Sequence, residues 1–293
     1  AGRPGNLLPV TLTDPDEQRA ASRESWETAA TAWGRRADRI REWGMPVSVA
    51  MIDALALQPG DQVLELAAGP GDTGFMAAEL IRPGGTLVCS DGADAMLQVA
   101  RSRAAEVGID NVEFQQLELE WIDMSTASVD AVLCRWGIML TVDPEAAARE
   151  IRRVLRQDGR AALAVWDLAE RNPWATIPGS VMVELGHAQP PDPDAPGMFV
   201  LGGDGRLEDL LEAAGFTEVE VQRVFLERRY TAADHFIGET LELSPMFGSA
   251  YRELEETARA EVQHRIVSRL APFTAADGAV TLPGCTLVAR AIS

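Results

Sequence analysis

Apolar runs of strand length alternate with amphipathic segments through the first half of the chain. Such runs fit strands that are buried on both faces of a sheet. We predict strands over residues 61–66, 86–91, 112–116, 131–134 and 160–166. Apolar residues at helical spacing between them predict helices over residues 46–57, 75–80, 94–106 and 143–155. This alternation indicates a parallel, doubly wound sheet.

The rhythm breaks after Trp166. Residues 167–203 are rich in proline and glycine, which predicts an irregular insertion with a short helix over residues 178–186. The rest of the chain predicts a helix over 207–214, a long strand over 217–230, mainly helix over 232–270 and a last strand over 282–292. We expect the insertion and the 232–272 helices to form a cap above the carboxyl edge of the sheet.

These patterns predict an α/β fold: a doubly wound, seven-stranded, mainly parallel sheet with helical cap insertions. Residues 16–43 read as helix, and residues 1–13 as disordered or loosely packed. We divide the chain into an N-terminal helical lid (1–45), a ligand-binding core (46–166), a cap insertion (167–206), a continuation of the core (207–231), a helical cap (232–272) and a terminal core strand (273–293).

The composition narrows the classes of partner. The formal net charge of −19 argues against a nucleic-acid backbone or an anionic membrane, because both require a positive protein surface. A small, neutral or cationic substrate fits better. The sequence contains no lysine, so a P-loop lysine or a Schiff-base lysine is excluded. We assign no metal ligands and no oligomeric state.

Three features of the sequence point to the cytoplasm. Cys89, Cys134 and Cys285 lie in apolar runs and form no paired framework, which is typical of buried thiols in a reducing compartment. Residues 1–10 lack the basic start and apolar centre of a signal peptide. No apolar run is long enough to span a bilayer. We therefore expect a soluble cytoplasmic protein.

A glycine turn at residues 69–74 follows the first predicted strand. Gly69, Gly71 and Gly74 satisfy the G-x-G-x-x-G pattern, and Asp91 lies 20 residues beyond Gly71, so a dinucleotide site is formally possible. Glu65, however, stands four residues before Gly69, where a carboxylate would repel a pyrophosphate. It suits a ligand with an ammonium group and a sulfonium.

At this turn the chain resembles the class I S-adenosylmethionine-dependent methyltransferases. Residues 65–71 follow the family motif acidic-x-Gly-x-Gly-x-Gly, except that Ala67 replaces the first glycine. Residues 90–97 resemble the second motif, whose strand-end acid, here Asp91, holds the ribose hydroxyls. Residues 117–119 resemble the element whose acid and following amide read adenine, with Glu118 in place of aspartate.

The resemblance continues to residue 166 in the correct order. Residues 128–130 are similar to the Ser-Phe-Asp that precedes the fourth strand, and residues 150–160 are similar to the segment before the fifth. The implied cofactor is S-adenosylmethionine. The cofactor-binding residues that we predict are Trp33, Glu65, Ala67, Gly69, Gly71, Asp91, Gly92, Glu118, Leu119 and Arg135.

For the acceptor we predict contacts with Trp26, Trp136 and His187. Trp26 and Trp33 lie seven residues apart on one helix face, where they either anchor the segment or close over a ligand. Arg135 and Trp136 follow the fourth strand, where the family lines the methyl-transfer site; packing is the alternative. His187 is the candidate base, with a purely structural role as the alternative. For Glu65 and Asp91 the alternative to cofactor binding is a role as helix N-cap or loop residue without a ligand.

The apolar and aromatic cap suits a bulky apolar ligand. The layout resembles ubiquinone- and menaquinone-type or natural-product methyltransferases. We therefore predict methyl transfer to an oxygen or carbon of a small apolar or aromatic molecule, as part of secondary metabolism. The alternatives are a nicotinamide-dependent reductase and a catalytically silent cofactor-binding protein that acts through interactions.

Overall fold

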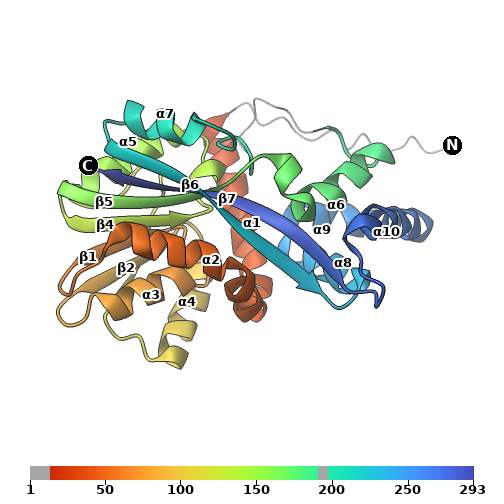
Figure 1. Cartoon of the computed structure of the whole chain (residues 1–293), viewed down its shortest axis with the longest axis horizontal. Coiled ribbons are helices and arrows are strands. Elements are labelled where there is room, and N and C mark those ends of the chain that lie inside the picture. Colours follow the sequence, from red (N-terminus) through yellow and green to blue (C-terminus); the bar gives the residue numbers. More distant parts are fainter. Residues whose placement is uncertain (1–13, 191–196) are drawn as a thin grey trace.

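The computed structural model describes residues 14–190 and 197–293 (Figure 1). The disorder predicted for residues 1–13 lies outside this part of the chain. Within it, seven strands form one sheet in the order β3-β2-β1-β4-β5-β7-β6. The strands are β1 (Gln62–Leu66), β2 (Thr86–Asp91), β3 (Val112–Gln116), β4 (Val129–Arg135), β5 (Leu155–Trp166), β6 (Thr217–Tyr230) and β7 (Val280–Ile292). Strands β1 to β5 are parallel and β7 is antiparallel to both neighbours, which confirms the predicted fold class.

Helices flank the sheet and build the cap. The described residues form α1 (Pro15–Arg35), α2 (Ala37–Leu55), α3 (Asp72–Leu80), α4 (Asp94–Val107), α5 (Pro144–Val154), α6 (Pro173–Glu184), α7 (Arg206–Ala213), α8 (Ala233–Leu243), α9 (Pro245–Arg252) and α10 (Glu256–Leu270). Figure 1 shows α6, α8, α9 and α10 gathered at the far end of the long β6–β7 ribbon, away from β1 to β4. Neither described segment contains a helix both long and apolar enough to cross a bilayer.

Helix α2 begins well before the predicted start at Pro46. It starts at Ala37 and continues through the proline, which costs one hydrogen bond within the helix. The helix nevertheless persists because its apolar face is buried over its whole length, from Ile40 through Val47 to Leu55. Burial of such side chains contributes about 1.5–3 kcal/mol each, enough to offset the proline.

Several further boundaries differ from the prediction, among them the start of β5, which is Leu155 and not Arg160, and two where a proline is involved. Helix α6 begins at Pro173, five residues earlier than predicted, because a proline in the first turn of a helix leaves no intrahelical bond unmade. Strand β7 begins at Val280 and contains Pro283. Since β5 pairs with β7 only as far as Thr286, the strand has a single neighbour at Pro283, and the missing N–H does not interrupt the sheet.

The apolar residues form a main core and a separate cap core. The main core lies between the sheet and its flanking helices and includes Leu64, Val132 and Leu163. The cap core includes Phe236 of α8 and Leu282 of β7. The outer ends of β6 and β7 therefore carry the cap. The division of the chain into segments stays a prediction.

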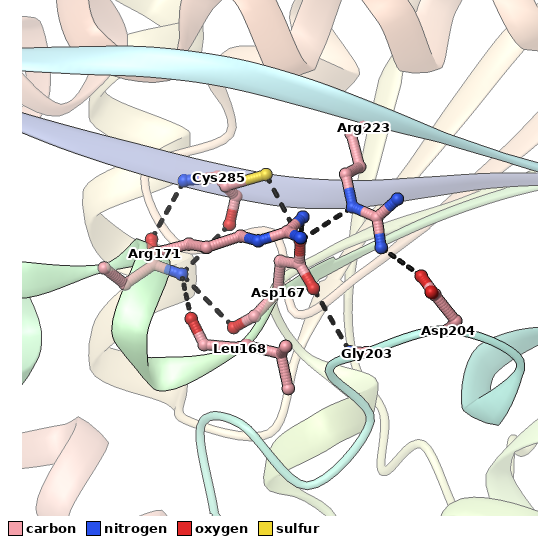
Figure 2. A network of polar contacts seen from close by, with 8 residues as sticks. Asp167, Leu168, Arg171, Gly203, Asp204, Arg223 and Cys285 are labelled. Atoms are coloured by element: carbon pink, nitrogen blue, oxygen red, sulfur yellow. Dashed lines mark hydrogen bonds and ion pairs between the residues drawn. The ribbon is translucent and has the colours of Figure 1, made fainter.

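One carboxylate ties the cap insertion to the sheet (Figure 2). Asp167 follows β5 directly and is fully buried. It accepts hydrogen bonds from Arg171 (2.6 Å), Arg223 of β6 (3.0 Å), the Gly203 N–H (3.2 Å) and the Cys285 thiol (3.4 Å). Burial alone would raise the pKa of Asp167, but these bonds and one from the Leu168 N–H lower it to about 2.

Candidate active site

A cavity of about 170 Å³ opens at the carboxyl ends of β1, β2 and β4. Its wall combines the glycine turn, the loops that follow β2, β3 and β4, and one face of α1. The lining residues are 19, 22, 23, 26, 33, 67–70, 91–93, 96, 118–121, 135–137 and 140–142. In open parallel sheets ligands bind at this edge, so we take the cavity as the candidate active site.

A larger hollow of about 540 Å³ lies at the opposite edge of the sheet, beside Arg149, Arg152 and Arg153. It is an open depression near the start of β5. The guanidinium of Arg153 already binds Glu150 and the carbonyl oxygens of Ile122 and Met124. Basic residues in the last turn of α5 also complement the helix dipole, so this hollow has a structural explanation.

Left-handed backbone conformations shape the glycine turn. Gly69 has a φ of 55° and Gly71 a φ of 87°. A Cβ atom at position 71 would lie 2.5 Å from the ring of Phe75, so this residue must be glycine for two reasons. Ala67 adopts a φ of 50° despite its methyl group. The turn thus brings main-chain atoms directly to the cavity wall.

Asp91 joins the first two strand ends. One carboxylate oxygen accepts the Gly69 N–H at 2.9 Å, and the other accepts the Ala93 N–H at 3.0 Å. Burial raises the pKa of this carboxyl, an effect that the two N–H donors oppose. Because a carboxylate has about four acceptor positions, Asp91 retains capacity to bind hydroxyl groups in the cavity.

Glu65 lies behind the glycine turn and does not line the cavity. Its Oε1 accepts the N–H of Gly74 in the first turn of α3 at 2.9 Å, so the side chain caps that helix from a neighbouring strand. Its Oε2 is buried without a hydrogen-bond partner among the described residues. Burial raises the pKa of Glu65 to about 8.

Helix α1 covers the cavity through two ion pairs. Arg23 contacts Glu118 at 2.7 Å, and Arg19 binds Glu120, which also accepts the N–H groups of Val142 and Asp143. The same helix face carries two tryptophans. Trp26 and Trp33 pack edge to face with ring centroids 5.3 Å apart, against a small apolar cluster. The Trp33 indole N–H donates to the carbonyl of Leu243 in the cap.

Arg135 and Trp136 close the opposite end of the cavity. The guanidinium of Arg135 lies 4.6 Å from the centroid of the Trp136 ring, a cation–π contact. Trp136 has a φ of 61°, which is rare for a bulky residue and marks a constrained turn. Its indole N–H donates to Thr286 at 3.2 Å, and its ring stacks on Trp166 at 4.3 Å.

The structure brings most of the predicted site residues together. Those that line the cavity are Trp26, Trp33, Ala67, Gly69, Asp91, Gly92, Glu118, Leu119, Arg135 and Trp136. Glu65 and Gly71 support the wall from behind. His187 follows α6 in the cap and does not line the cavity. The roles assigned to these residues stay predictions.

Thirteen lining residues were not predicted from the sequence, among them Arg19, Arg23, Glu120 and Trp121. For Arg19 and Glu120 the sequence contained a pattern that could have indicated them. Arg19 precedes Trp26 by seven residues, as Trp26 precedes Trp33, so all three share one helix face. Glu120 follows Glu118 by two residues in the same loop. The approach of α1 to that loop is a tertiary contact that no local pattern carries.

The chain is similar to known methyltransferases. Residues 57–187 match a protein family described as "Methyltransferase domain". The nocamycin O-methyltransferase of Saccharothrix syringae is 30% identical over 208 residues, which are 68% of this chain and 74% of that protein. The ubiquinone/menaquinone biosynthesis C-methyltransferase UbiE of Hahella chejuensis is 36% identical over 110 residues, 37% of this chain and 44% of its own length.

A solved structure has the same fold. The YcgJ protein of Bacillus subtilis superimposes with a TM-score of 0.55 over 84% of this chain and 97% of its own, at 22% sequence identity. The sequence similarity covers most of the length of the nocamycin O-methyltransferase. The strand-end carboxylates, the glycine turn and the sheet order are consistent with it. The chain therefore belongs to the class I S-adenosylmethionine-dependent methyltransferases.

Proposed function

We propose that this protein transfers a methyl group from S-adenosylmethionine to an oxygen or carbon atom of a small apolar or aromatic molecule. When bound, S-adenosylmethionine supplies an electrophilic methyl group on a sulfonium. The proposal rests above all on Asp91, whose carboxylate lies at the cavity wall, oriented by the N–H groups of Gly69 and Ala93.

The cavity wall has the donors and acceptors that this cofactor needs. Asp91 would accept the ribose hydroxyls through its remaining lone pairs. Glu118 and the N–H of Leu119 would contact adenine, with Glu118 shared between the base and Arg23. The bend at Gly69 leaves open space where a side chain would otherwise project, so the main chain can approach the ligand.

The contribution of the protein to such a reaction is chiefly positioning and exclusion of water. Helix α1 covers the cavity through the Arg19–Glu120 and Arg23–Glu118 pairs. Trp33 links this cover to the cap through Leu243. A site closed by aromatic and apolar side chains strengthens the electrostatic contacts inside it, because water no longer screens them.

The names of two relatives support the choice of acceptor atom. One is an O-methyltransferase and the other a C-methyltransferase. The aromatic side chains that line the cavity, which include Trp26, Trp121 and Trp136, support a bulky apolar acceptor. Localisation in the cytoplasm and a place in secondary metabolism belong to the same proposal.

Calorimetry with S-adenosylhomocysteine tests the cofactor site. We expect Asp91→Asn to weaken binding about 10- to 100-fold, because hydrogen bonds to a charged group contribute about 1.5–3 kcal/mol. Asp94→Asn is the matched control, since Asp94 is exposed and lies one turn away. Equal affinity of the Asp91→Asn variant and the unmodified protein would contradict the proposed site.

Two further measurements separate the alternatives. A nicotinamide-dependent reductase would show quenching of tryptophan fluorescence by NADH and no response to S-adenosylhomocysteine. A catalytically silent protein would bind S-adenosylhomocysteine but methylate nothing in a metabolite panel. We expect mass spectrometry of that panel to find one product heavier by a methylene unit.

A further inference from the structure

The charged groups of the cavity are divided between its two ends. Asp91 ends β2 and Glu118 follows β3, both on one side of β1 in the sheet. Arg135 ends β4, on the other side of β1. If the acids hold the ribose and adenine, the reacting end of the ligand points toward β4, so Arg135 lies where the acceptor arrives.

The guanidinium of Arg135 has no partner of opposite charge. Among residues 14–190 and 197–293 no carboxylate lies within 4.0 Å of it, and its Nη1 is buried without a hydrogen bond. The acids whose charges act on the Arg135 guanidinium from a greater distance are Asp72 and Glu65. Asp72 pairs with Arg103 at 2.8 Å. Glu65, with a pKa of about 8, is mainly uncharged at neutral pH.

The surrounding chain is shaped to hold this cation. Gly44, in the middle of α2, faces Nη1 so closely that a Cβ atom there would lie 2.4 Å from it. A glycine inside a helix costs roughly 0.5–1 kcal/mol relative to alanine. On the other side the guanidinium stacks on Trp136, whose left-handed backbone is itself strained. Gly44 and Trp136 therefore enclose the guanidinium, with Nη1 on the α2 side, and Arg135 also lines the cavity.

The cavity also lacks a free general base. Among its described lining residues there is no histidine, cysteine or tyrosine. Asp91 accepts two N–H groups, Glu118 pairs with Arg23, and Glu120 binds Arg19 and two further N–H groups. An acceptor that must lose a proton finds no unpaired base among these lining residues. An acceptor that arrives already ionised needs none.

We propose that Arg135 binds an ionised oxygen of the acceptor, a carboxylate, phenolate or enolate carried on a planar apolar frame. This inference rests on the proposed function and specifies its substrate class. The planar frame follows from the aromatic side chains that line the cavity together with Arg135: Trp136, Trp26, Trp33 and Trp121. The carboxylate of the cofactor itself is the other possible source of the anion.

A pair of isosteric probes tests the proposal. Calorimetry in the presence of saturating S-adenosylhomocysteine compares 2-naphthoate, an anion, with 2-naphthamide, its neutral counterpart. We expect the unmodified protein to prefer the anion at least tenfold. Arg135→Gln should abolish this preference and Arg135→Lys should keep part of it, because lysine retains the charge but not the planar stack. Arg41→Gln, on the exposed side of α2, should behave as the unmodified protein.

Binding of S-adenosylhomocysteine to the variants separates the two sources of the anion. We expect Arg135→Gln to bind it within twofold of the unmodified protein, which also shows that the variant is folded. A tenfold or greater loss would assign Arg135 to the cofactor carboxylate and overturn the proposal. Absence of naphthoate binding, or no preference over naphthamide, would overturn it as well. In each case intact S-adenosylhomocysteine binding by the unmodified protein would leave the proposed function standing.

Discussion

Glu65 has a different environment at each of its two oxygens. Oε1 accepts the Gly74 N–H, while Oε2 is buried beside Gly74 without a partner among the described residues. An ionised carboxylate in this position is poorly solvated, which explains the pKa of about 8. The native state therefore binds one more proton than the unfolded chain between about pH 4.5 and 8, and its stability falls as the pH rises through this window.

Glu65→Gln should remove this pH dependence. The amide keeps an acceptor for Gly74 and carries no charge. At pH 5 we expect the variant and the unmodified protein to unfold at similar urea concentrations. At pH 8 we expect the variant to be more stable by about 2–4 kcal/mol. Glu79→Gln, an exposed change on α3, controls for loss of a surface charge. A stability difference that does not change between pH 5 and pH 8 would show that Glu65 is ionised in the native protein.

The position of Glu65 could be predicted from the sequence, but its orientation could not. The acidic residue before a glycine turn was predicted to mark the ligand edge of the sheet, and the cavity opens at that edge. A side chain at a strand end can face either the cavity or the following helix, and here the N-terminus of α3 offers an unpaired N–H. For Asp91 the same kind of prediction placed the side chain at the cavity wall.

At the scale of elements, α1 connects the cavity to two parts of the fold. Besides its ion pairs with Glu118 and Glu120, it carries Glu27, which accepts the N–H groups of Asp94 and Ala95 at 2.7 and 2.9 Å. These are the first N–H groups of α4, whose own cap residue, Ala93, has no side-chain acceptor. Helix α1 is therefore held both at the loop that carries Glu118 and at the start of α4, beside Asp91.

Weakening this cover should speed release of S-adenosylhomocysteine. We expect the double variant Arg19→Gln/Arg23→Gln to raise the dissociation rate about 3- to 10-fold in stopped-flow fluorescence, since partly exposed ion pairs contribute up to about 1 kcal/mol each. Release from the unmodified protein should accelerate with salt, and release from the variant should respond less. Arg41→Gln is the control. Equal rates would mean that α1 does not limit release.

The order of the elements could be predicted because hydrophobic periodicity is local. Strands β1 to β5 and helix α5 lie where the pattern placed them, apart from a few residues at their ends. The predicted helix is shorter than α2 because the prediction starts it at Pro46, although the apolar face already begins at Ile40. Burial against the sheet decides that case, and burial depends on the fold as a whole.

At the scale of the whole molecule, Asp167 is the point where sheet, ribbon and cap meet. Its partners come from the insertion, from β6 and from β7 (Figure 2). Removal of one partner from a buried ion pair costs about 3–5 kcal/mol, and less where the other partners reach solvent, as Arg171 and Arg223 do.

Asp167→Asn should destabilise the protein by about 2–3 kcal/mol at pH 7 in urea unfolding. The folded pKa of about 2 lies below the ordinary value of 3.8, so the contribution is complete above about pH 4 and is lost as the pH falls toward 2. The difference between variant and unmodified protein should shrink accordingly in acid. Asp204→Asn, which alters an exposed partner of Arg223, should cost below about 1 kcal/mol. Similar losses for both variants would contradict a special role for the buried carboxylate.

The β6–β7 ribbon has an evolutionary consequence. Its outer ends support a separate apolar core. The cap joins the rest of the molecule through the ribbon, the Asp167 contacts, the α1–cap contacts and the contacts of Arg36 and α2 with the cap. Residues of the cap can be exchanged without repacking the glycine turn or the β2 carboxylate. Under the proposed function, this arrangement lets the range of acceptors diverge while the chemistry is inherited unchanged.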